Sequence, residues 1–302
     1  MYAVVLAGGQ GTRLRPLTDA RPKPLVPFMG EPFAVGLLRR LAGAGCTRVW
    51  FLVGADAAPF AAVAAAGRGL GIDVAVLAED RPLDTAGAAR RLLRAADEPV
   101  LVCNGDVLTD LDYADLARRH AAAGATATLA LTRVAEPSSF GLVLCDPDGR
   151  VRRFVEKPPP GTADADTVNA GTYVLAPDVF EPFAGDGPLS FERTVFPGLL
   201  AAGRVVLGVV SNAYWQDLGT PARYLDGHRA VLEGRCAWPG SRSLQRSGDL
   251  VAVDATATVD PSARLGPVVV VGAGCRIEAG ATVAESVLHG GVRVGPAARV
   301  HG

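Results

Sequence analysis

Three glycines and two arginines directly follow a short apolar run at the start of the chain. The run, residues 2–7 (YAVVLA), predicts a strand that is buried on both faces. Glycine at positions 8, 9 and 11 lets the backbone take positive φ and lets a ligand approach the chain closely. Consecutive N–H groups in such a turn form a concavity that suits anions, and the planar donor fork of Arg13 matches phosphate oxygens. The stretch therefore predicts a loop that binds polyphosphate.

The glycine spacing differs from the two best-known phosphate-binding motifs. The segment 8–11, GGQG, does not match G-x-G-x-x-G, so the dinucleotide-binding motif is not supported. It does not match G-x-x-x-x-G-K-[ST] either, because no Lys-Ser or Lys-Thr pair follows the glycines. An ordinary glycine-rich turn after a strand remains an alternative for this loop taken alone.

A lysine lies between two prolines a few residues further on, at Pro22-Lys23-Pro24. Each proline fixes its own φ and biases the preceding residue toward extended geometry, so the segment is stiff. A stiff support suits a lysine that must direct its charge at a phosphate. A solvated lysine on a proline-rich surface turn is the alternative for this segment in isolation.

The two segments together resemble the signature of the sugar-1-phosphate nucleotidyltransferases, also called nucleotide-sugar pyrophosphorylases. These enzymes join a nucleoside triphosphate to a sugar 1-phosphate and release pyrophosphate. The resemblance implies that Arg13 and Lys23 take part in catalysis. It also implies nucleotide contacts from the residues of the loop, which are Leu6, Ala7, Gly8, Gly9, Gly11, Thr12 and Arg13.

Two aspartates from distant parts of the chain match further motifs of this family. Asp106 lies in the segment 104–106, NGD, which directly follows an apolar strand. Asp217 lies in WQDLG, which resembles the family motif W-x-D-x-G. Carboxylates suit a hard cation, and the resemblance implies that Asp106 and Asp217 bind Mg²⁺ and act in catalysis. It also places Asn104 and Asp106 beside the nucleotide. A turn or helix-capping role is the alternative for each aspartate alone.

Three further segments resemble the sugar-phosphate site of the family. Glu156 and Lys157 match its E-K-P motif, in which the glutamate binds sugar hydroxyls and the lysine binds the sugar phosphate. Asn169 and Gly171 match its N-A-G motif, and Gly141 matches a glycine whose N–H faces the sugar. A carboxylate can accept two hydroxyl hydrogen bonds, which fits the role implied for Glu156. A surface salt pair before a proline run is the alternative for Glu156 and Lys157.

The segment 82–88, PLDTAGA, resembles the P-L-G-T-A-G-A segment of mannose-1-phosphate guanylyltransferases. In the family this region contacts the base, so the resemblance implies nucleotide contacts from Asp84, Thr85 and Gly87. It also implies GTP and mannose 1-phosphate as substrates. Three alternatives remain: thymidylyl or uridylyl transfer to glucose 1-phosphate, guanylyl transfer to a heptose or cyclitol 1-phosphate, and a catalytically inactive regulatory subunit.

One departure from the guanylyl pattern bears on the base, because Asp84 stands where that pattern has glycine. A carboxylate there can accept hydrogen bonds from both N1–H and the exocyclic amine of guanine. Uracil and thymine lack this donor pair, and a site built for it rejects them. The alternative is that Asp84 caps a helix that begins at Thr85.

Apolar runs alternate with helical patterns over much of the chain. Strands are expected at 48–53, 72–78, 100–103 and 204–210, and helices at 33–44, 57–66 (closed by Gly67), 85–95 and 221–234. The alternation predicts an α/β, Rossmann-like nucleotidyltransferase domain with a mostly parallel sheet that becomes mixed near residue 125. Ligands bind beyond the carboxyl ends of such strands, where the glycine loop and the segments 79–87 and 104–106 all fall.

A six-residue period follows the segment 237–250, which is rich in Ser, Arg, Gly and Pro and is predicted to be a linker. Aliphatic residues recur at every sixth position from Val253 to Val283 and, after a one-residue slip, from Leu288 to Val300. This repeat predicts a parallel β-helix, and it resembles the left-handed β-helix at the C-terminus of many family members. The expected domains are therefore 1–236 and 251–302, joined by the linker.

The predicted β-helix is short, with fewer than three coils. Its open end near Leu288, Val294 and Val300 is expected to be apolar and to need cover, most simply from a partner subunit in a homo-oligomer. A hexapeptide-repeat acyltransferase is the alternative for the tail. Such enzymes need more coils and a catalytic histidine in a trimeric groove.

Composition argues against several other classes of protein. The net charge of -1 gives no basic footprint for nucleic acid. No apolar run approaches the roughly 18 residues that span a bilayer, and neither a membrane partner nor a secretory leader is expected. Five scattered cysteines without a C-x-x-C pair predict neither a disulfide framework nor a zinc site, and they favour a reducing cytoplasm.

Overall fold

The computed structural model describes residues 1–248 and 250–302, and it divides into two compact units. Unit 1 comprises Met1–Gly9, Leu41–Gly105 and Leu111–Trp215, and unit 2 comprises Gln10–Arg40, Asp106–Asp110 and Gln216–Gly302. Among the described residues, none of the helices is long and apolar enough to cross a membrane.

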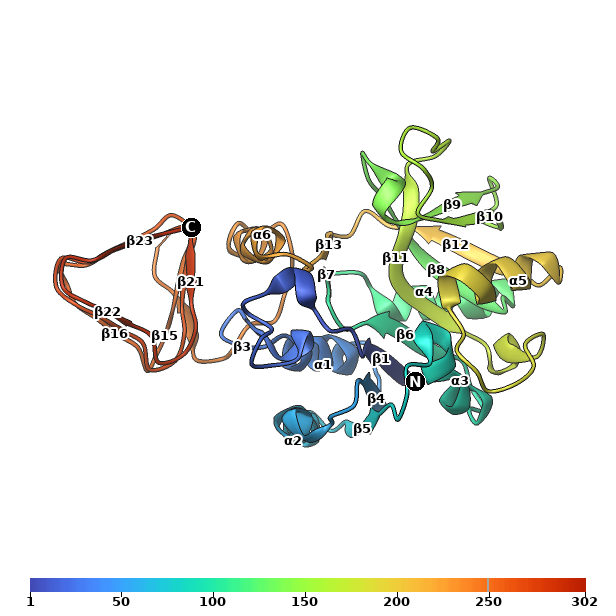
Figure 1. Cartoon of the computed structure of the whole chain (residues 1–302), viewed down its shortest axis with the longest axis horizontal. Helices are drawn as coiled ribbons and strands as arrows, with labels where there is room; N and C mark the ends of the chain where they lie inside the picture. The colour runs from blue at the N-terminus through green and yellow to red at the C-terminus, as the bar shows by residue number, and fades with distance from the viewer. Residues whose placement is uncertain (249) are drawn as a thin grey trace. The chain divides into compact units, whose positions relative to one another are not determined.

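A nine-stranded mixed sheet forms the centre of unit 1 (Figure 1). Its strands are β1 (Tyr2–Ala7), β4 (Arg48–Val53), β5 (Asp73–Ala78), β6 (Val100–Asn104), β8 (Ala127–Arg133), β9 (Gly141–Cys145), β10 (Val151–Glu156), β11 (Thr167–Leu175) and β12 (Val206–Val210). Their order is β10-β9-β11-β6-β1-β4-β5, and β8 pairs with β11 and β12. The first four are parallel, whereas β11 runs antiparallel to β6, β8 and β9. The expected mixed sheet is therefore confirmed.

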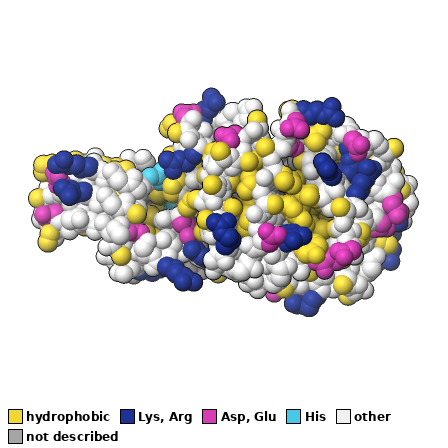
Figure 2. Space-filling model, turned by 90° about the horizontal axis from the view of Figure 1, so that it is seen from below, with side chains coloured by type: hydrophobic (Ala, Val, Ile, Leu, Met, Phe, Trp, Pro, Cys, Tyr) yellow, Lys and Arg dark blue, Asp and Glu magenta, His cyan; other side chains and the backbone are white. Residues whose placement is uncertain are grey.

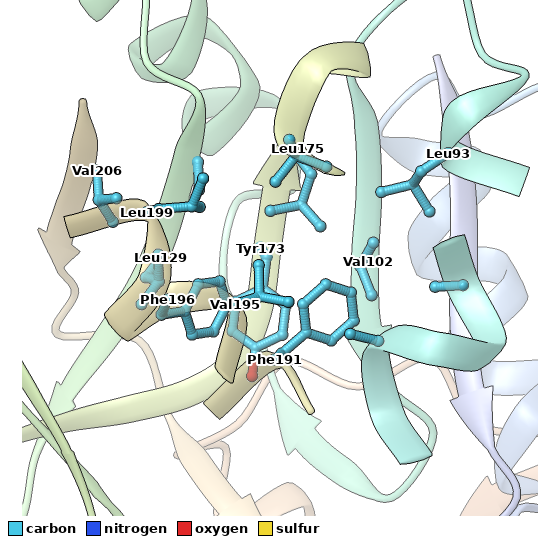
Figure 3. Close-up of a cluster of buried hydrophobic side chains, with 14 of the residues drawn as sticks. Leu93, Val102, Leu129, Tyr173, Leu175, Phe191, Val195, Phe196, Leu199 and Val206 are labelled. Carbon is cyan, nitrogen blue, oxygen red and sulfur yellow. The ribbon is translucent and has the colours of Figure 1, made fainter. Parts of the chain in front are cut away.

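Helices cover both faces of this sheet. They are α2 (Ala61–Gly69), α3 (Asp84–Arg94), α4 (Tyr113–Ala123) and α5 (Phe196–Ala201). Side chains alternate between the faces of a strand, so Leu129 and Thr128 of β8 point to opposite sides. Leu129 lies in an apolar core with Leu93 of α3 and Phe196 of α5 (Figure 3). On the other face, Thr128 Oγ1 lies 2.9 Å from Nδ1 of His120, which belongs to α4.

Helix α2 does not end at Gly67, as the sequence predicts, but continues to Gly69. Gly67 is buried, and a Cβ atom added there would lie 2.2 Å from Cγ2 of Val74 in β5. The glycine therefore allows close packing of the helix on the sheet. The prediction was wrong because the sequence does not reveal whether a glycine in a helical pattern ends the helix or permits a tight contact.

Before the tail, unit 2 contains helix α6 and several short elements. They are η1 (Thr12–Leu14), η2 (Lys23–Leu25), β2 (Pro27–Phe28), β3 (Glu31–Pro32), β7 (Val107–Thr109) and α6 (Pro221–Leu232), while α1 (Phe33–Gly43) and β13 (Trp215–Asp217) cross its boundary. His228 of α6 is fully buried, and burial lowers its pKa to about 3, so the ring is neutral. Its Nε2 accepts a hydrogen bond from Met29 N–H at 3.2 Å, and Tyr224 O–H donates to Pro27 O. These bonds tie α6 to the segment that follows Lys23.

Nine parallel strands of the tail form three sheets and trace a triangle in Figure 1; one of these sheets gains a fourth, antiparallel strand from the preceding segment. The strands are β15 (Val251–Asp254), β16 (Thr258–Val259), β17 (Arg264–Leu265), β18 (Val269–Val271), β19 (Arg276–Ile277), β20 (Thr282–Ala284), β21 (Ser286–Leu288), β22 (Arg293–Val294) and β23 (Arg299–His301). Val269 pairs with Val251, eighteen positions earlier, and with Ser286, seventeen positions later. The one-residue slip in the repeat thus shortens the last coil and keeps its apolar residues in the common core.

The segment 237–250 is more ordered than the predicted linker. Strand β14 (Leu244–Arg246) pairs antiparallel with β15, and Trp238 stacks on Phe33 with ring centroids 4.7 Å apart. Asp249 lies outside the described residues. The two compact units are not continuous segments of the chain, so they do not test the predicted boundaries at 236 and 250. These boundaries stay predictions.

The end of the tail exposes less apolar surface than expected. Leu288 and Val294 are only 7% and 4% exposed, because both point into the core of the coil. The outward positions carry charge instead, and arginines lie beside acidic side chains on the tail at the left of Figure 2. Arg293 of β22, for example, lies 2.5 Å from Glu278. The prediction of an exposed apolar end was therefore wrong for Leu288 and Val294, whereas Val300, the third predicted residue, is partly exposed.

Candidate active site

A lysine lies between two carboxylates in unit 2. Lys23 Nζ is 2.5 Å from Asp106 Oδ2 and 3.3 Å from Asp217 Oδ1, and the lysine side chain is only 10% exposed. Lys23 begins the short helix η2, Asp106 directly precedes β7, and Asp217 ends β13. A backbone hydrogen bond from Leu218 N–H to Asp106 O joins the two acidic segments. The structure therefore brings together the three residues that the sequence motifs single out.

Two arginines complete this cluster around Asp217. Arg13 Nη2 lies 3.8 Å and Arg223 Nη1 3.2 Å from Asp217 Oδ2. Arg13 is 70% exposed, so most of its donor fork is free to bind an anion. The sequence analysis did not predict Arg223. It lies in the first turn of α6, where Thr220 Oγ1 caps the helix by accepting the N–H of Arg223.

The carboxylates of Asp106 and Asp217 converge on a single cation, so they could share a metal ion in place of Lys23. Among the described residues, no group of three or more His, Cys, Asp or Glu side chains is arranged to hold a metal. Mg²⁺ is commonly bound by one or two carboxylates together with substrate phosphates and water. The pair therefore fits Mg²⁺ that binds together with a nucleotide.

A second polar cluster lies in unit 1, around Glu192. Its Oε2 accepts hydrogen bonds from Thr85 Oγ1 and Ser190 Oγ, both at 2.9 Å, and its Oε1 accepts one from Tyr173 O–H at 3.4 Å. The tyrosine oxygen in turn accepts a bond from Asn169 Nδ2 at 2.7 Å. Two predicted contact residues, Thr85 for the nucleotide and Asn169 for the sugar, are therefore linked through a glutamate that the sequence analysis missed.

Glu192 lies on a π-helical turn, η6 (Phe191–Val195), which directly precedes α5. Single π-turns within helices occur frequently at functional sites. The neighbouring Arg193 forms an ion pair with Asp84. The sequence FERTV gives no periodic signal for such a turn, and only its charged pair within an aromatic run could have drawn attention to it.

Glu156 ends strand β10 opposite Gly141 of β9. A Cβ atom at position 141 would lie 2.7 Å from Phe154 and 3.1 Å from Glu156 Oε2, so only glycine fits beside the carboxylate. Burial, together with the negative charge of Glu192, raises the pKa of Glu156 against the opposing effect of Lys157 and Arg193. Lys157 Nζ lies 3.6 Å from Glu156 Oε1 and is largely exposed.

Gly171 and Asn104 lie in close contact at the end of the sheet. A Cβ atom added to Gly171 would meet Asn104 Nδ2 at 2.5 Å, and Gly171 has a φ of 71° that favours glycine. The Gly171 N–H also donates to Asn169 Oδ1 at 2.9 Å. The structure therefore explains this glycine by packing and conformation, while its contact with a sugar stays a prediction.

Asp84 has a φ of 61°, a left-handed conformation that favours glycine. Its Oδ1 accepts the N–H of Thr85, but the N–H groups of Ala86 and Gly87 donate to the backbone oxygen of Leu189. Because α3 begins at Asp84, Asp84 accepts the second N–H of the helix, and Leu189 accepts the third and the fourth. Asp84 is thus the first residue of α3 and not its N-cap, but its carboxylate still satisfies one N–H at the start of the helix, so the structural alternative for Asp84 stays open. The N–H of Gly87 is not available to a nucleotide.

The glycine loop begins as predicted, where β1 ends at Ala7. Gly11 has a φ of 63°, which confirms the need for glycine there. Glu79, another residue that the sequence analysis missed, follows β5, and its Oε2 lies 3.8 Å from the position that a Cβ atom of Gly8 would take. Burial raises the pKa of Glu79, and the nearby charge of Asp84 adds to this effect. The nucleotide contacts predicted for Leu6, Gly9 and Thr12 stay predictions.

Comparison with known proteins identifies the family. Residues 2–234 match the model of the nucleotidyl transferase family. The chain belongs to this family. It is 38% identical to a mannose-1-phosphate guanylyltransferase of Mycobacterium tuberculosis over 97% of the chain and 80% of that protein. It is 34% identical to a mannose-1-phosphate guanyltransferase of Pichia angusta over 88% of the chain and 73% of that protein.

A solved structure shares the fold of this nucleotidyl transferase. HddC from Yersinia pseudotuberculosis, in complex with GMP-PN, superposes with a TM-score of 0.64 and is 27% identical, over 76% of this chain and 99% of that one. Of the predicted site residues, Lys23, Asp106 and Asp217 lie together in unit 2, and Thr85 and Asn169 lie in the cluster around Glu192 in unit 1.

The electrostatics of Glu156 can be tested by two opposite charge changes. Glu192→Gln removes a negative neighbour and should lower the pKa of the Glu156 carboxyl, whereas Arg193→Ala removes a positive neighbour and should raise it. Carboxyl ¹³C NMR titration of the two variants and the wild type measures both shifts. Shifts of the same sign in the two variants would contradict the assignment of these neighbours.

Proposed function

We propose that the protein transfers a guanylyl group from GTP to mannose 1-phosphate, which releases pyrophosphate and forms GDP-mannose. The observation that carries this proposal is the cluster of Lys23, Asp106 and Asp217 in a chain that aligns along 97% of its length with a mannose-1-phosphate guanylyltransferase. A protein of the same fold, solved in complex with GMP-PN, supports a guanine nucleotide. An intact cluster also argues against the alternative of an inactive regulatory subunit.

The proposed reaction needs positioning more than acid–base chemistry. An oxygen of the sugar 1-phosphate attacks the α-phosphorus of GTP, a new P–O bond forms, and the bond to the β-phosphate breaks as pyrophosphate leaves. The nucleophile is already an anion near neutral pH, so no protein general base is required. The barrier is lowered by alignment and by cationic groups around the phosphates. Arg13 is suited to the leaving pyrophosphate, Lys23 to the transferred phosphoryl group and Lys157 to the sugar phosphate.

We infer that Asp106 and Asp217 hold Mg²⁺ when GTP is bound. The ion would neutralise charge on the phosphates and help to align them. Lys23, which lies between the two carboxylates, would then be released toward the nucleotide. In the absence of the ion, the positive charge of Arg223 would weaken the repulsion between the carboxylates of Asp217 and Asp106.

The sugar is proposed to bind in unit 1, beside Glu156 and Asn169. Glu156, Asn169 and the backbone of Gly141 and Gly171 offer acceptors and donors for hydroxyl groups. Mannose 1-phosphate is favoured over glucose, heptose and cyclitol 1-phosphates because it is the substrate in the names of the relatives. A panel of these sugar phosphates with GTP, ATP, UTP and dTTP tests the proposal, and turnover with another pair only would contradict it.

Loss of either carboxylate of the Lys23 cluster should abolish most of the activity. Asp106→Asn and Asp217→Asn should each lower kcat by on the order of 10²-fold to 10³-fold, because charge alignment at the α-phosphate is lost. Asp226→Asn, an exposed aspartate on α6, is the matched control and should be as active as the wild type. Pyrophosphate release with GTP and mannose 1-phosphate, measured with and without EDTA, provides the rates. Near-normal turnover in both active-site variants would remove the assignment.

The base preference should depend on a carboxylate in the segment 79–84. If Asp84 reads guanine, Asp84→Ser should lower the ratio of kcat/KM for GTP over ATP by roughly tenfold or more. Glu79 is the competing candidate, because its carboxylate lies beside Gly8 of the glycine loop. Specificity constants for the four triphosphates in Asp84→Ser and Glu79→Gln separate the two. Unchanged selectivity in Asp84→Ser rules out a base-reading role for Asp84. Unchanged selectivity in both variants means that neither carboxylate determines the preference for GTP.

We propose that the tail is a left-handed β-helix and that it mediates a homo-oligomer. The strands of the last coil, β21 to β23, are edge strands, and edges present backbone groups that can pair with another chain. Thr282 N–H donates to Ala298 O, so the N–H of Arg299 points away from β20.

Light scattering at micromolar concentration should therefore give at least twice the mass of the chain. Arg299→Pro, which removes a backbone donor at this edge, should weaken the association, whereas Arg299→Ala should not. A monomeric wild type would exclude the oligomer.

The cysteines support a reducing compartment, and we propose the cytoplasm. All five are free, and four are buried. Burial raises the pKa of Cys46 to about 11, so its thiol is protonated and unreactive at neutral pH.

A further inference from the structure

We propose that Glu192 is a positioning residue that couples the nucleotide segment of α3 to the sugar-binding Asn169. This inference rests on the proposed function, because it assigns Glu192 a role between the two substrates of that reaction. The hydrogen bonds of Glu192 lead in two directions, to Thr85 at the start of α3 and through Tyr173 to Asn169 on β11.

The branch toward the sugar fixes the orientation of an amide. Asn169 Nδ2 donates to the oxygen of Tyr173, and the tyrosine can accept this bond because its own proton is donated to Glu192. On the other side, Asn169 Oδ1 accepts the N–H of Gly171. One N–H and one lone pair of the amide remain for a ligand. Without an acceptor at position 192, the tyrosine hydroxyl would lose its preferred direction and Asn169 its fixed rotamer.

The branch toward the nucleotide fixes the first turn of α3. Thr85 Oγ1 donates to Glu192 and accepts the N–H of Phe191 at 3.0 Å, so its hydroxyl is used in both directions. The next two N–H groups of the helix donate to Leu189 O, in the loop that leads to the π-turn. The start of α3 is therefore held by the loop and turn that carry Glu192.

A carboxylate is required at the junction of the two branches. Three hydroxyl donors, from Thr85, Ser190 and Tyr173, converge on Glu192, and an ionised carboxylate has only acceptor sites. A glutamine would direct its NH₂ group at one or more of these donors. The π-turn adds one residue to the helical turn at this place, and its cap, Ser190, is itself one of the donors.

Steady-state kinetics with GTP and mannose 1-phosphate tests the coupling. Glu192→Gln should raise the KM of both substrates by about tenfold, with a smaller change in kcat, because each branch loses a directed hydrogen bond. Tyr173→Phe removes one branch and should raise only the KM of mannose 1-phosphate. Thr85→Val removes the other and should raise only the KM of GTP, whereas Thr85→Ser, which keeps the hydroxyl, should behave like the wild type.

A double-mutant cycle shows whether Tyr173 acts through Asn169. In an Asn169→Ala background, Tyr173→Phe should have no further effect on the KM of mannose 1-phosphate. Glu181→Gln, which changes an exposed glutamate outside the cluster, is the control for loss of a carboxylate and should leave all constants unchanged. Melting temperatures with and without each substrate confirm that the variants are folded and bind their ligands.

The outcomes separate this inference from the proposed function. Wild-type protein that neither turns over nor binds GTP and mannose 1-phosphate would overturn both. An active wild type with unchanged Michaelis constants in Glu192→Gln, or with additive effects of Tyr173→Phe and Asn169→Ala, would overturn the coupling alone. If Glu192→Gln does not fold, the Thr85 and Tyr173 variants decide.

Discussion

Two carboxylates from distant segments share one largely buried lysine, and much of unit 2 depends on this contact. Asp106 and Asp217 would repel each other without a cation between them, and the mostly buried Lys23 needs both partners. The three residues reach one point because η2 begins at Lys23, β7 begins directly after Asp106 and β13 ends at Asp217. The buried His228 and Tyr224 of α6 hold the segment after Lys23 in place. The proposed Mg²⁺ would satisfy the same pair of negative charges as Lys23 does.

The cluster in unit 1 solves a similar problem with hydroxyl groups. Glu192 is surrounded by donors from Thr85, Ser190 and Tyr173, so most of its charge is balanced by hydrogen bonds. Glu156 has fewer partners, and its raised pKa follows from burial beside a second carboxylate. A ligand rich in hydroxyls would supply the missing donors at Glu156. One glutamate thus organises the protein around it, while the other is left available to a substrate.

Sequence patterns predicted the elements whose signal is local and missed those fixed by tertiary contacts. Strand β4 and the shortened last coil of the tail follow directly from apolar runs and a six-residue period. The π-turn at Glu192 has no such signal, and its hydrogen bonds lead to Thr85 and Tyr173, which lie far from it in the sequence. Gly67 and β14 were misjudged for a related reason. The partner that explains each one, Val74 or β15, is identified only by the fold.

Asp84 combines an unfavourable backbone conformation with structural contacts of its side chain. Its left-handed conformation costs about 1 kcal/mol or more relative to glycine. The ion pair with Arg193, which is 66% exposed, contributes at most about 1 kcal/mol in return. The hydrogen bond from Thr85 N–H to Asp84 Oδ1 at the start of α3 adds to the ion pair, so the contacts of the aspartate offset the cost of its backbone conformation. The aspartate is therefore accounted for by its contacts within the protein, and a role in recognising the base would come in addition to them.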